Sequence, residues 1–183
     1  MSMKNIIGDY QAFFLVQLRR LSDIQIDISG CELSHLAFRT KNDQEYLHAR
    51  EEIERHCTSS IENVWNGRPM SIIQLEAPLV LGAGFEVSVI ELIPPVHRRV
   101  YKMGIEHFGV VIGDSVDEFS RKHRSVLSGQ QFQSKECEPY YVTFYEDFTT
   151  VKFYRQPLLE ICESQHGRPF EGISHVENWN FTI

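Results

Sequence analysis

Two stretches of the chain resemble each other, one in each half. The first is Cys31-Glu-Leu-Ser-His35-Leu-Ala-Phe-Arg-Thr40, and the second is Met103-Gly-Ile-Glu-His107-Phe-Gly-Val-Val-Ile-Gly-Asp114. Each is typical of a β-strand with a histidine near its centre. A duplicated unit brings equivalent positions together across a pseudo-two-fold axis, so we expect the two imidazoles to meet where they can hold one metal ion.

Each of these stretches opens a similar succession of predicted elements. In the first half, the pattern indicates a strand, a helix and three strands at 31–40, 42–57, 60–66, 70–79 and 85–93. In the second half, it indicates the same succession at 104–113, 115–128, 130–137, 140–146 and 149–155. Asn42 or Asp43 is expected to cap the first of these helices, and Asp114 or Ser115 the second. Both halves therefore read as βαβββ.

The predicted fold is α+β, a single domain over 1–183 in which two paired βαβββ units form a curved mixed sheet around a central cavity. The N-terminal extension covers 1–30 and the first unit 31–95. The second unit covers 104–156 and the C-terminal extension 157–183. The N-terminal extension carries an amphipathic helix at 3–22 that packs on the outside. Pro157 is expected to open a terminal helix from Leu158 to about Gln165.

Composition limits the expected partners. With 183 residues, of which 42% are hydrophobic, the chain can bury a core. The net charge is -7 and the basic residues form no long run, so we expect neither a nucleic acid nor an anionic membrane as partner. The four cysteines are scattered and favour reduced thiols. No secretory signal and no apolar stretch of roughly 20 residues is visible, so a cytoplasmic location and a small-molecule ligand are predicted.

Strand parity predicts that both histidines face the cavity. Side chains alternate along a strand, and the bulkier apolar set of each strand is expected to face the helices. The expected cavity-facing residues are Leu33, His35, Ala37 and Arg39 in the first strand and Ile105, His107, Gly109 and Val111 in the second. The small Ala37 and Gly109 leave room beside the imidazoles. The alternative, that each histidine is an ordinary polar residue of a strand, stays open.

A carboxylate is expected to complete the site. Glu91 lies in the middle of the strand Val87-Ser-Val-Ile-Glu91-Leu-Ile, among apolar residues. An unpaired buried carboxylate costs several kcal/mol, so a cation or a proton is expected to neutralise it. Metal ligation explains this position best, and an ion pair with Arg39 or Arg68 is the alternative.

The fourth ligand position has two candidates. Glu160 lies 53 residues after His107, close to the 56 residues between His35 and Glu91. The apolar pattern of Thr149-Thr-Val-Lys152-Phe-Tyr instead makes Lys152 the counterpart of Glu91. A protonated lysine has no free lone pair, so this alternative leaves three protein ligands and open positions for water or substrate.

Four more residues are candidates for binding a ligand in the cavity, and no catalytic residue is assigned. They are Arg39, Gln74, Lys152 and Tyr154, each on an inward parity. Lys152 can anchor a carboxylate or phosphate, although a solvated lysine at a strand edge is the commoner case. Arg39 can equally pair with an acid, and Tyr154 can be a core aromatic residue.

The sequence resembles the YecM-like family of the vicinal-oxygen-chelate superfamily, which includes glyoxalase, bleomycin-resistance proteins and extradiol dioxygenases. The resemblance rests on the motifs around His35 and His107, on Asn66-Gly-Arg-Pro69, on Val-Ile-Glu91-Leu and on Thr149-Thr-Val-Lys-Phe. It implies a paired βαβββ fold and a divalent-metal site on His35, Glu91 and His107. Metal enzymes of the superfamily commonly take a fourth ligand, usually Glu, from the last strand of the second unit, where Lys152 stands here unless Glu160 substitutes.

These observations lead to two main functional hypotheses. The first is a protein that binds a divalent ion (Zn, Ni, Mn, Co or Fe) and acts as an isomerase, epimerase, lyase or oxygenase on a small oxygen-rich substrate. The second is a non-catalytic protein that binds or sequesters a small molecule in the same cavity. A third hypothesis is a scaffold with structural histidines. One chain supplies both units, so a monomer suffices and a dimer is allowed.

Overall fold

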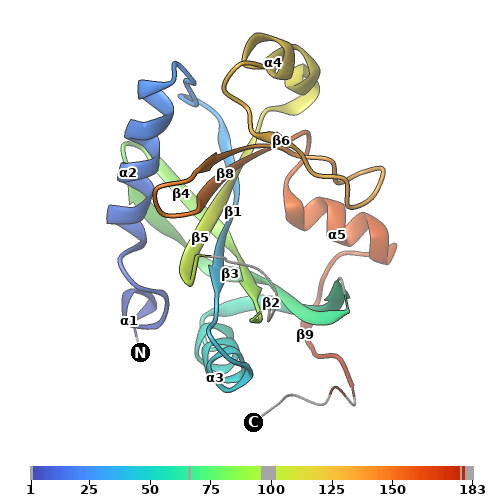
Figure 1. The fold of residues 1–183 in the computed structure, drawn as a ribbon. Coiled ribbons are helices and arrows are strands. Elements are labelled where there is room, and N and C mark those ends of the chain that lie inside the picture. Colours follow the sequence, from blue (N-terminus) through green and yellow to red (C-terminus); the bar gives the residue numbers. More distant parts are fainter. Residues whose placement is uncertain (1, 66, 96–101, 178, 180–183) are drawn as a thin grey trace.

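One curved mixed sheet organises the molecule, here a computed structural model that describes residues 2–65, 67–95, 102–177 and 179. Within that part, the strands run in the order β6-β7-β8-β5-β1-β4-β3-β2-β9. Their bounds are β1 Glu32–Arg39, β2 Cys57–Trp65, β3 Arg68–Gly82, β4 Phe85–Ile93, β5 Gly104–Val111, β6 Gly129–Gln130, β7 Tyr140–Phe144, β8 Thr149–Tyr154 and β9 Gly172–Ser174. The predicted α+β class is confirmed (Figure 1).

The sheet is close to symmetric about the boundary between β1 and β5. These two strands pair antiparallel, β1 pairs parallel with β4 on its other side, and β5 pairs parallel with β8. Outward from the centre, the order is β1-β4-β3-β2 on one side and β5-β8-β7-β6 on the other. Along the chain, the elements follow as β1-α3-β2-β3-β4 and β5-α4-β6-β7-β8, which is the predicted succession. The predicted subdivision of the single domain stays a prediction.

The helices of the described residues differ from the prediction mainly at the N-terminus. They are α1 Met3–Ile7, α2 Tyr10–Asp23, α3 Asp43–Glu54, α4 Val116–Lys122 and α5 Leu158–His166. The single helix predicted at 3–22 is wrong, because Gly8 leaves the helical region with φ 91° and the side chain of Asp9 caps a new helix by accepting from the Ala12 N–H. No helix in the described ranges combines the length and apolarity needed to cross a membrane.

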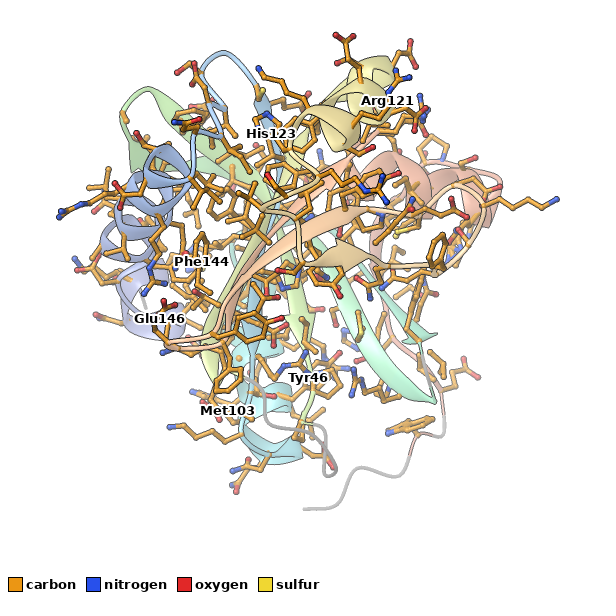
Figure 2. The ribbon with its side chains drawn as sticks, turned by 45° about the horizontal axis from the view of Figure 1, so that its top comes forward. Tyr46, Met103, Arg121, His123, Phe144 and Glu146 are labelled. Atoms are coloured by element: carbon orange, nitrogen blue, oxygen red, sulfur yellow. The ribbon has the colours of Figure 1, made fainter. Side chains whose placement is uncertain are left out.

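The predicted start of α3 is confirmed, and its cap is Asn42. The Oδ1 of Asn42 accepts a hydrogen bond of 2.8 Å from the Glu45 N–H, while the Glu45 side chain accepts from the Lys41 N–H. This reciprocal arrangement satisfies two of the amide donors that a helix N-terminus exposes. α3 then presents Tyr46 to the sheet (Figure 2), where its hydroxyl donates to Glu62 on β2 at 2.7 Å.

Two predictions in the outer parts of the molecule need correction, and one strand there was not predicted. The helix predicted at 115–128 ends at Lys122 after a 3₁₀ turn at Gly113–Ser115. The strand predicted at 130–137 is reduced to β6 and an isolated bridge between Ser134 and Cys137. β9 was not predicted at all, because its three residues are exposed and carry no alternating apolar pattern.

Apolar residues fill both faces of the sheet. The larger core lies between the sheet and α1, α2 and α3, and in it the ring of Phe14 packs against Phe85 and Phe108 at centroid distances of 5.2 and 5.1 Å. A smaller core lies on the face that carries α5, and includes Ile161 and Tyr154. Each fully buried side chain of this size contributes about 1.5–3 kcal/mol to stability. The two cores clamp the central strands in place from both faces.

The β7–β8 hairpin is fastened to α2. Arg20 forms an ion pair of 3.1 Å with Asp147, and its guanidinium lies 5.1 Å from the centroid of the Phe144 ring. Figure 2 shows Phe144 and Glu146 at this hairpin, beside α2. A buried hydrogen bond of 3.0 Å from Gln17 to Thr149 adds a second link. These contacts connect the N-terminal extension to the second half and fix the strand that carries Lys152.

Candidate metal centre

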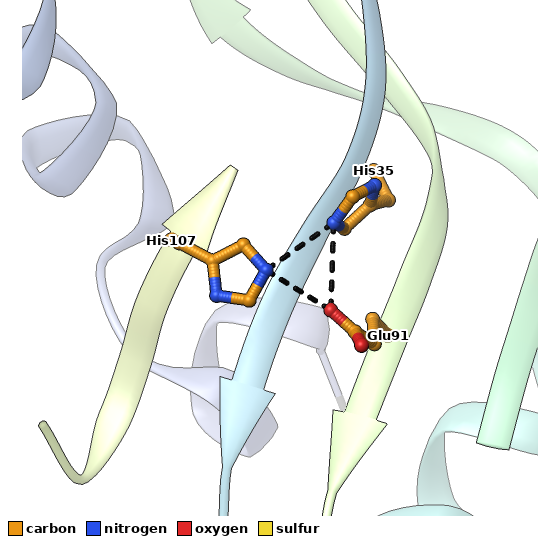
Figure 3. Close-up of side chains that lie close together, drawn as sticks. All are labelled: His35, Glu91 and His107. Atoms are coloured by element: carbon orange, nitrogen blue, oxygen red, sulfur yellow. Dashed lines mark hydrogen bonds and ion pairs between the residues drawn. The ribbon is translucent and has the colours of Figure 1, made fainter. Parts of the chain in front are cut away.

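Three buried side chains from the three central strands converge on one point (Figure 3). His35 lies on β1, Glu91 on β4 and His107 on β5. The two Nε2 atoms are 3.3 Å apart, and Glu91 Oε2 lies 3.4 Å from His35 Nε2 and 3.0 Å from His107 Nε2. The predicted meeting of the two imidazoles across the centre of the sheet is therefore present in the structure.

The strand register explains why these side chains meet. Ala37 of β1 pairs with Glu91 on one side and with His107 on the other. Its methyl group is small, so the two longer side chains can reach across it. His35 lies two residues earlier on β1 and thus on the same face of the sheet.

Two β-bulges shape the site, and each places one extra residue directly before a histidine. Between β1 and β5, the pairing passes from Leu33 to His35 and leaves Ser34 without an opposite residue. On the other strand, it passes from His107 to Ile105 and leaves Glu106 without one. A bulge of this kind re-aims a side chain. The parity prediction is wrong beyond the bulges, because Leu33 and Ile105 belong to the core under the helices.

These extra residues hold the histidine rings by their Nδ1 atoms. Ser34 Oγ lies 2.9 Å from His35 Nδ1 and accepts a hydrogen bond of 2.7 Å from the Leu158 N–H at the start of α5. Glu106 Oε1 lies 3.2 Å from His107 Nδ1. An ionised carboxylate can only accept, so a proton on His107 Nδ1 satisfies Glu106 and leaves the Nε2 lone pair for the site. The hydroxyl of Ser34 can accept from His35 in the same way.

Arg39 fixes Glu106 in its turn. Its Nη2 donates to Glu106 Oε1 at 3.1 Å, its Nε donates to the other oxygen, and its Nη1 donates to the carbonyl of Pro94 at 3.3 Å. Both side chains of this bidentate pair are buried. Burial acts to raise the pKa of Glu106, but hydrogen bonds with His107 and Arg39 lower it to about 2. Glu106 therefore stays ionised.

The protonation states at the centre suit metal ligation. Burial lowers the pKa of His35 to about 4, against the opposing effect of Glu91. Burial acts to raise the pKa of Glu91, but the adjacent imidazoles of His107 and His35 hold it well below its ordinary value. At neutral pH, His35 is therefore a neutral ligand and Glu91 an anionic one, which is the state that binds a cation.

The donor set fits a divalent cation. In the described part of the chain, the buried Oε2 of Glu91 accepts no hydrogen bond, although both Nε2 atoms lie within 3.4 Å of it. When both ring protons are on Nδ1, two lone pairs and a carboxylate oxygen face one another with no proton between them. Such a group is costly unless a cation occupies the centre. Two imidazole nitrogens and one carboxylate suit Zn, Mn, Co, Ni or Fe(II).

Gly109 leaves the space that the His35 ring occupies. A Cβ atom at this position would lie 2.6 Å from His35 Cε1 and 2.9 Å from a ring carbon of Tyr154. The ring of Tyr154 in turn packs edge-on against His35, with centroids 5.4 Å apart. Only glycine allows this close approach without displacement. Tyr154 thus supports His35, and the residues lining the main cavity do not include it.

A cavity of about 440 Å³ opens beside the three converging side chains. Glu91 and His107 reach its wall, whereas His35 is fully buried behind them. The other lining residues are Arg39, Trp65, Arg68, Met70, Ile93, Glu106, Gln130, Gln131, Gln133, Tyr141, Thr143, Phe148, Thr150 and Lys152. This volume suits a small molecule.

The structure separates the other predicted site residues into two groups. Arg39 and Lys152 line the cavity. Gln74 lies outside it on β3, where its side chain accepts a hydrogen bond from Ser59. Glu160 is exposed on α5 and is not among the three converging side chains. Among the described residues, the converging group therefore consists of three side chains.

Sequence reasoning missed Ser34 and Glu106. Strict alternation assigns both to the face opposite the histidines, together with apolar side chains such as Phe108. One signal was available: a glutamate on a face that is otherwise apolar requires a partner or a break in the alternation. The bulge at Glu106 is that break.

Comparisons with known proteins place the chain in a family. The family model described as "YecM protein" matches residues 2–152. An uncharacterised protein of Haemophilus influenzae is 28% identical over 134 residues, which are 70% of each chain. The solved structural-genomics protein EC4020 has a TM-score of 0.71 and 23% identity, covering 87% of this chain and 91% of its own, and so shares the fold.

A more distant match is a mutant of the fosfomycin resistance protein FosX from Listeria monocytogenes, complexed with Mn(II) and a dihydroxypropylphosphonic acid. It is 15% identical and covers 74% of this chain and 99% of its own, with a TM-score of 0.27 that establishes no likeness of fold. The family match, in contrast, extends over most of the chain, including all three converging residues. The chain belongs to the YecM family.

Proposed function

We propose that the protein binds one divalent metal ion through His35, Glu91 and His107 and uses it to hold a small oxygen-rich molecule in the adjoining cavity. The observation that carries this proposal is the convergence of three ligand atoms within 3.4 Å of one another. Ser34 and Glu106 hold the Nδ1 atoms, so both Nε2 atoms serve the centre. The cavity on the open side leaves room for a ligand of the ion.

This arrangement supports isomerase, epimerase or lyase chemistry, or oxygen chemistry with Fe(II). When bound, the ion would act as a Lewis acid toward an oxygen of the ligand. The chain's own residues orient that ligand: Glu91 and His107 form the floor of the cavity, and Lys152 stands on its wall. Two histidines and one carboxylate with open positions are also typical of Fe(II) oxygenases.

A non-catalytic binding protein is the second candidate. It is favoured because both carboxylates that line the cavity are already engaged by other groups. Glu106 is held by Arg39 and His107, and Glu91 belongs to the ligand group. Among the described residues that line the cavity, these two are the carboxylates. Neither is available to remove a proton, and a protonated lysine is not a base. A protein that binds without converting its ligand needs no such base.

Elemental analysis tests the metal site. The protein is purified without an affinity tag that carries metal and is compared with the double variant His35→Ala/His107→Ala. We expect about one metal ion per chain in the natural protein and its loss in the double variant. His166→Ala, at the exposed end of α5, is the matched control and should retain the metal. An absence of metal after reconstitution, or full retention in the double variant, would support a scaffold with structural histidines.

A panel of ligands then separates enzyme from binder. Metal-loaded protein is incubated with small hydroxy acids, keto acids and sugar derivatives, and both binding and product formation are recorded. Conversion that requires His107 supports the enzyme, whereas saturable binding without conversion supports the binder. Since one chain supplies all three ligands, we propose that a monomer suffices. We also propose that neither a nucleic acid nor a membrane is a partner.

A further inference from the structure

Lys152 occupies the position in the second half that Glu91 occupies in the first. Ala37 stands two residues after His35 and pairs with Glu91 of the neighbouring parallel strand. Gly109 stands two residues after His107 and pairs with Lys152 of its own neighbouring parallel strand. The register therefore identifies Lys152, and not Glu160, as the counterpart of Glu91.

Lys152 is half-buried and faces the same cavity as the metal ligands. It lines the wall together with Glu91 and His107. Among the residues that the structure describes, it forms no ion pair of 4.0 Å or less. A lysine on a cavity wall that pairs with no carboxylate of the described residues is suited to a ligand from solution.

Charge balance indicates what kind of ligand this would be. Arg39 and Glu106 neutralise each other as a bidentate pair. At the centre, a divalent ion exceeds the charge of Glu91 by one, and Lys152 adds a further positive charge. Arg68 also lines the cavity, so the excess is at least two positive charges, which is costly in a partly buried cavity without an anion. In a symmetric site, a second carboxylate would occupy the place of Lys152, and the excess would be smaller by two charges.

We propose that the protein takes a small dianion, a dicarboxylate or a phosphate-bearing acid, with one oxygen on the metal ion and another on the Lys152 ammonium group. This inference rests on the proposed metal site. Neutral donors complete the wall, since Gln131, Thr143 and Thr150 offer amide and hydroxyl groups. Trp65 and Met70 provide an apolar surface for a carbon skeleton. Lys152 is then the residue that selects anions, while the ion supplies the attachment point.

The test measures metal and anion binding separately. Manganese-loaded protein is titrated calorimetrically with malonate and with inorganic phosphate, and the bound metal is counted after gel filtration. The variants are Lys152→Met, which keeps the length without the charge, and Lys152→Glu, which places a carboxylate in the register position of Glu91. Lys135→Met, at an exposed loop position, is the matched control. Both titrations are repeated on metal-free protein.

We expect the natural protein and Lys135→Met to bind at least one of the two anions equally well. Lys152→Met should retain its manganese and bind the anion about tenfold more weakly or worse, because it loses a charge-assisted contact. Lys152→Glu should bind manganese about tenfold more tightly and lose the anion, because it gains a ligand. The metal-free protein should bind the anion weakly.

Two negative outcomes are distinguishable. In the first, the natural protein holds manganese, and Lys152→Met binds both anions as tightly as the natural protein. The inference about Lys152 is then overturned, and the metal site stands. Failure of the loaded protein to bind either anion has the same meaning. If the natural protein holds no metal under conditions that keep it folded, the proposed function fails, and this inference fails with it.

Discussion

Each half of the molecule places a histidine at the equivalent position of its first strand, but the side chains around the two histidines differ in charge. In the first half, the ring is held by the neutral hydroxyl of Ser34, and the neighbouring parallel strand contributes Glu91. In the second half, the ring is held by the ionised Glu106, and the equivalent position carries Lys152. The repeated backbone determines where an ion would sit, and the differing side chains determine how many ligands it has and what charge it attracts.

Removing the charge at each of the two equivalent positions should give the largest difference in metal affinity. Glu91→Gln removes the anionic ligand with little change of shape, and we expect metal affinity to fall on the order of 100-fold or more. Lys152→Gln, the same kind of change in the other half, should leave metal affinity unchanged or raise it, because it removes a repelling charge. Competition titration with a chromogenic chelator measures both. Equal losses in the two variants would contradict the assigned asymmetry.

The next largest difference in metal affinity is expected between variants of the two bulge residues, Glu106 and Ser34. Glu106→Gln weakens the hold on His107, and we expect metal affinity to fall by about 10–100-fold. Ser34→Ala removes a neutral partner of His35 and should cost less, because hydrogen bonds to charged groups are the stronger ones. The same chelator competition ranks the two variants.

Glu106→Gln also leaves Arg39 buried without its carboxylate, so this variant needs its own control. In the double variant Arg39→Met/Glu106→Gln, no unpaired charge remains, and part of the lost stability should return. If metal affinity returns with it, stability and not ring orientation caused the loss. A larger loss of metal affinity in Ser34→Ala than in Glu106→Gln would also contradict this account.

The two small residues beside the histidines sharpen the comparison further. Gly109→Ala gives the second half the methyl group that Ala37 already has in the first. Because that methyl group would lie 2.6 Å from His35 Cε1, we expect the ring to move and the free energy of unfolding to fall by about 1–2 kcal/mol. Urea denaturation measures the loss, and ring displacement should also weaken metal binding. Ala37→Gly, the reverse change, should lower stability by about 1–2 kcal/mol, because glycine has a freer backbone and a buried methyl group is lost, and it should leave metal binding intact.

A smaller effect concerns pH in the metal-free protein. His35 has a folded-state pKa of about 4 against an ordinary value of 6.5. As the pH falls below 6.5, the unfolded chain takes up a proton at His35 that the folded chain refuses, so stability decreases toward pH 4. Between about pH 7 and about pH 5.5, this amounts to about 1 kcal/mol.

Urea denaturation in the presence of chelator measures the pH effect, with His35→Gln as the comparison. The substituted side chain does not titrate, so the difference in stability between the two proteins should shrink as the pH falls through this range. His166→Ala, which changes an exposed histidine, should keep the pH dependence of the natural protein. A difference that is constant with pH would contradict the assigned burial of a neutral His35.

Most of the central sheet could be predicted because its signals are local. β4 has the predicted bounds, and β1 and α3 begin and end within three residues of them. The meeting of His35 and His107 followed from duplication and parity, and Glu91 was added because a carboxylate among apolar residues needs a cation or a proton. Parity also favoured Lys152 as the counterpart of Glu91, which the register now supports.

The remaining features depend on tertiary structure. The bulges at Ser34 and Glu106 arise where two strands pair out of step, and one strand's sequence does not record its partner's register. β9 is set by pairing with β2 and has no buried residue to mark it. The break at Gly8 was readable, since a glycine followed by Asp9 is a helix stop followed by a cap, but the apolar periodicity across it outweighed that signal.

The central claim is that both halves give one ligand set to a single ion. Crystals soaked in manganese and measured above the manganese absorption edge test it most directly. We predict one anomalous peak per chain between the three side chains, about 2.0–2.2 Å from His35 Nε2, His107 Nε2 and a carboxylate oxygen of Glu91. A peak elsewhere, or none at this point while the ring nitrogens keep their present contacts, would contradict the account.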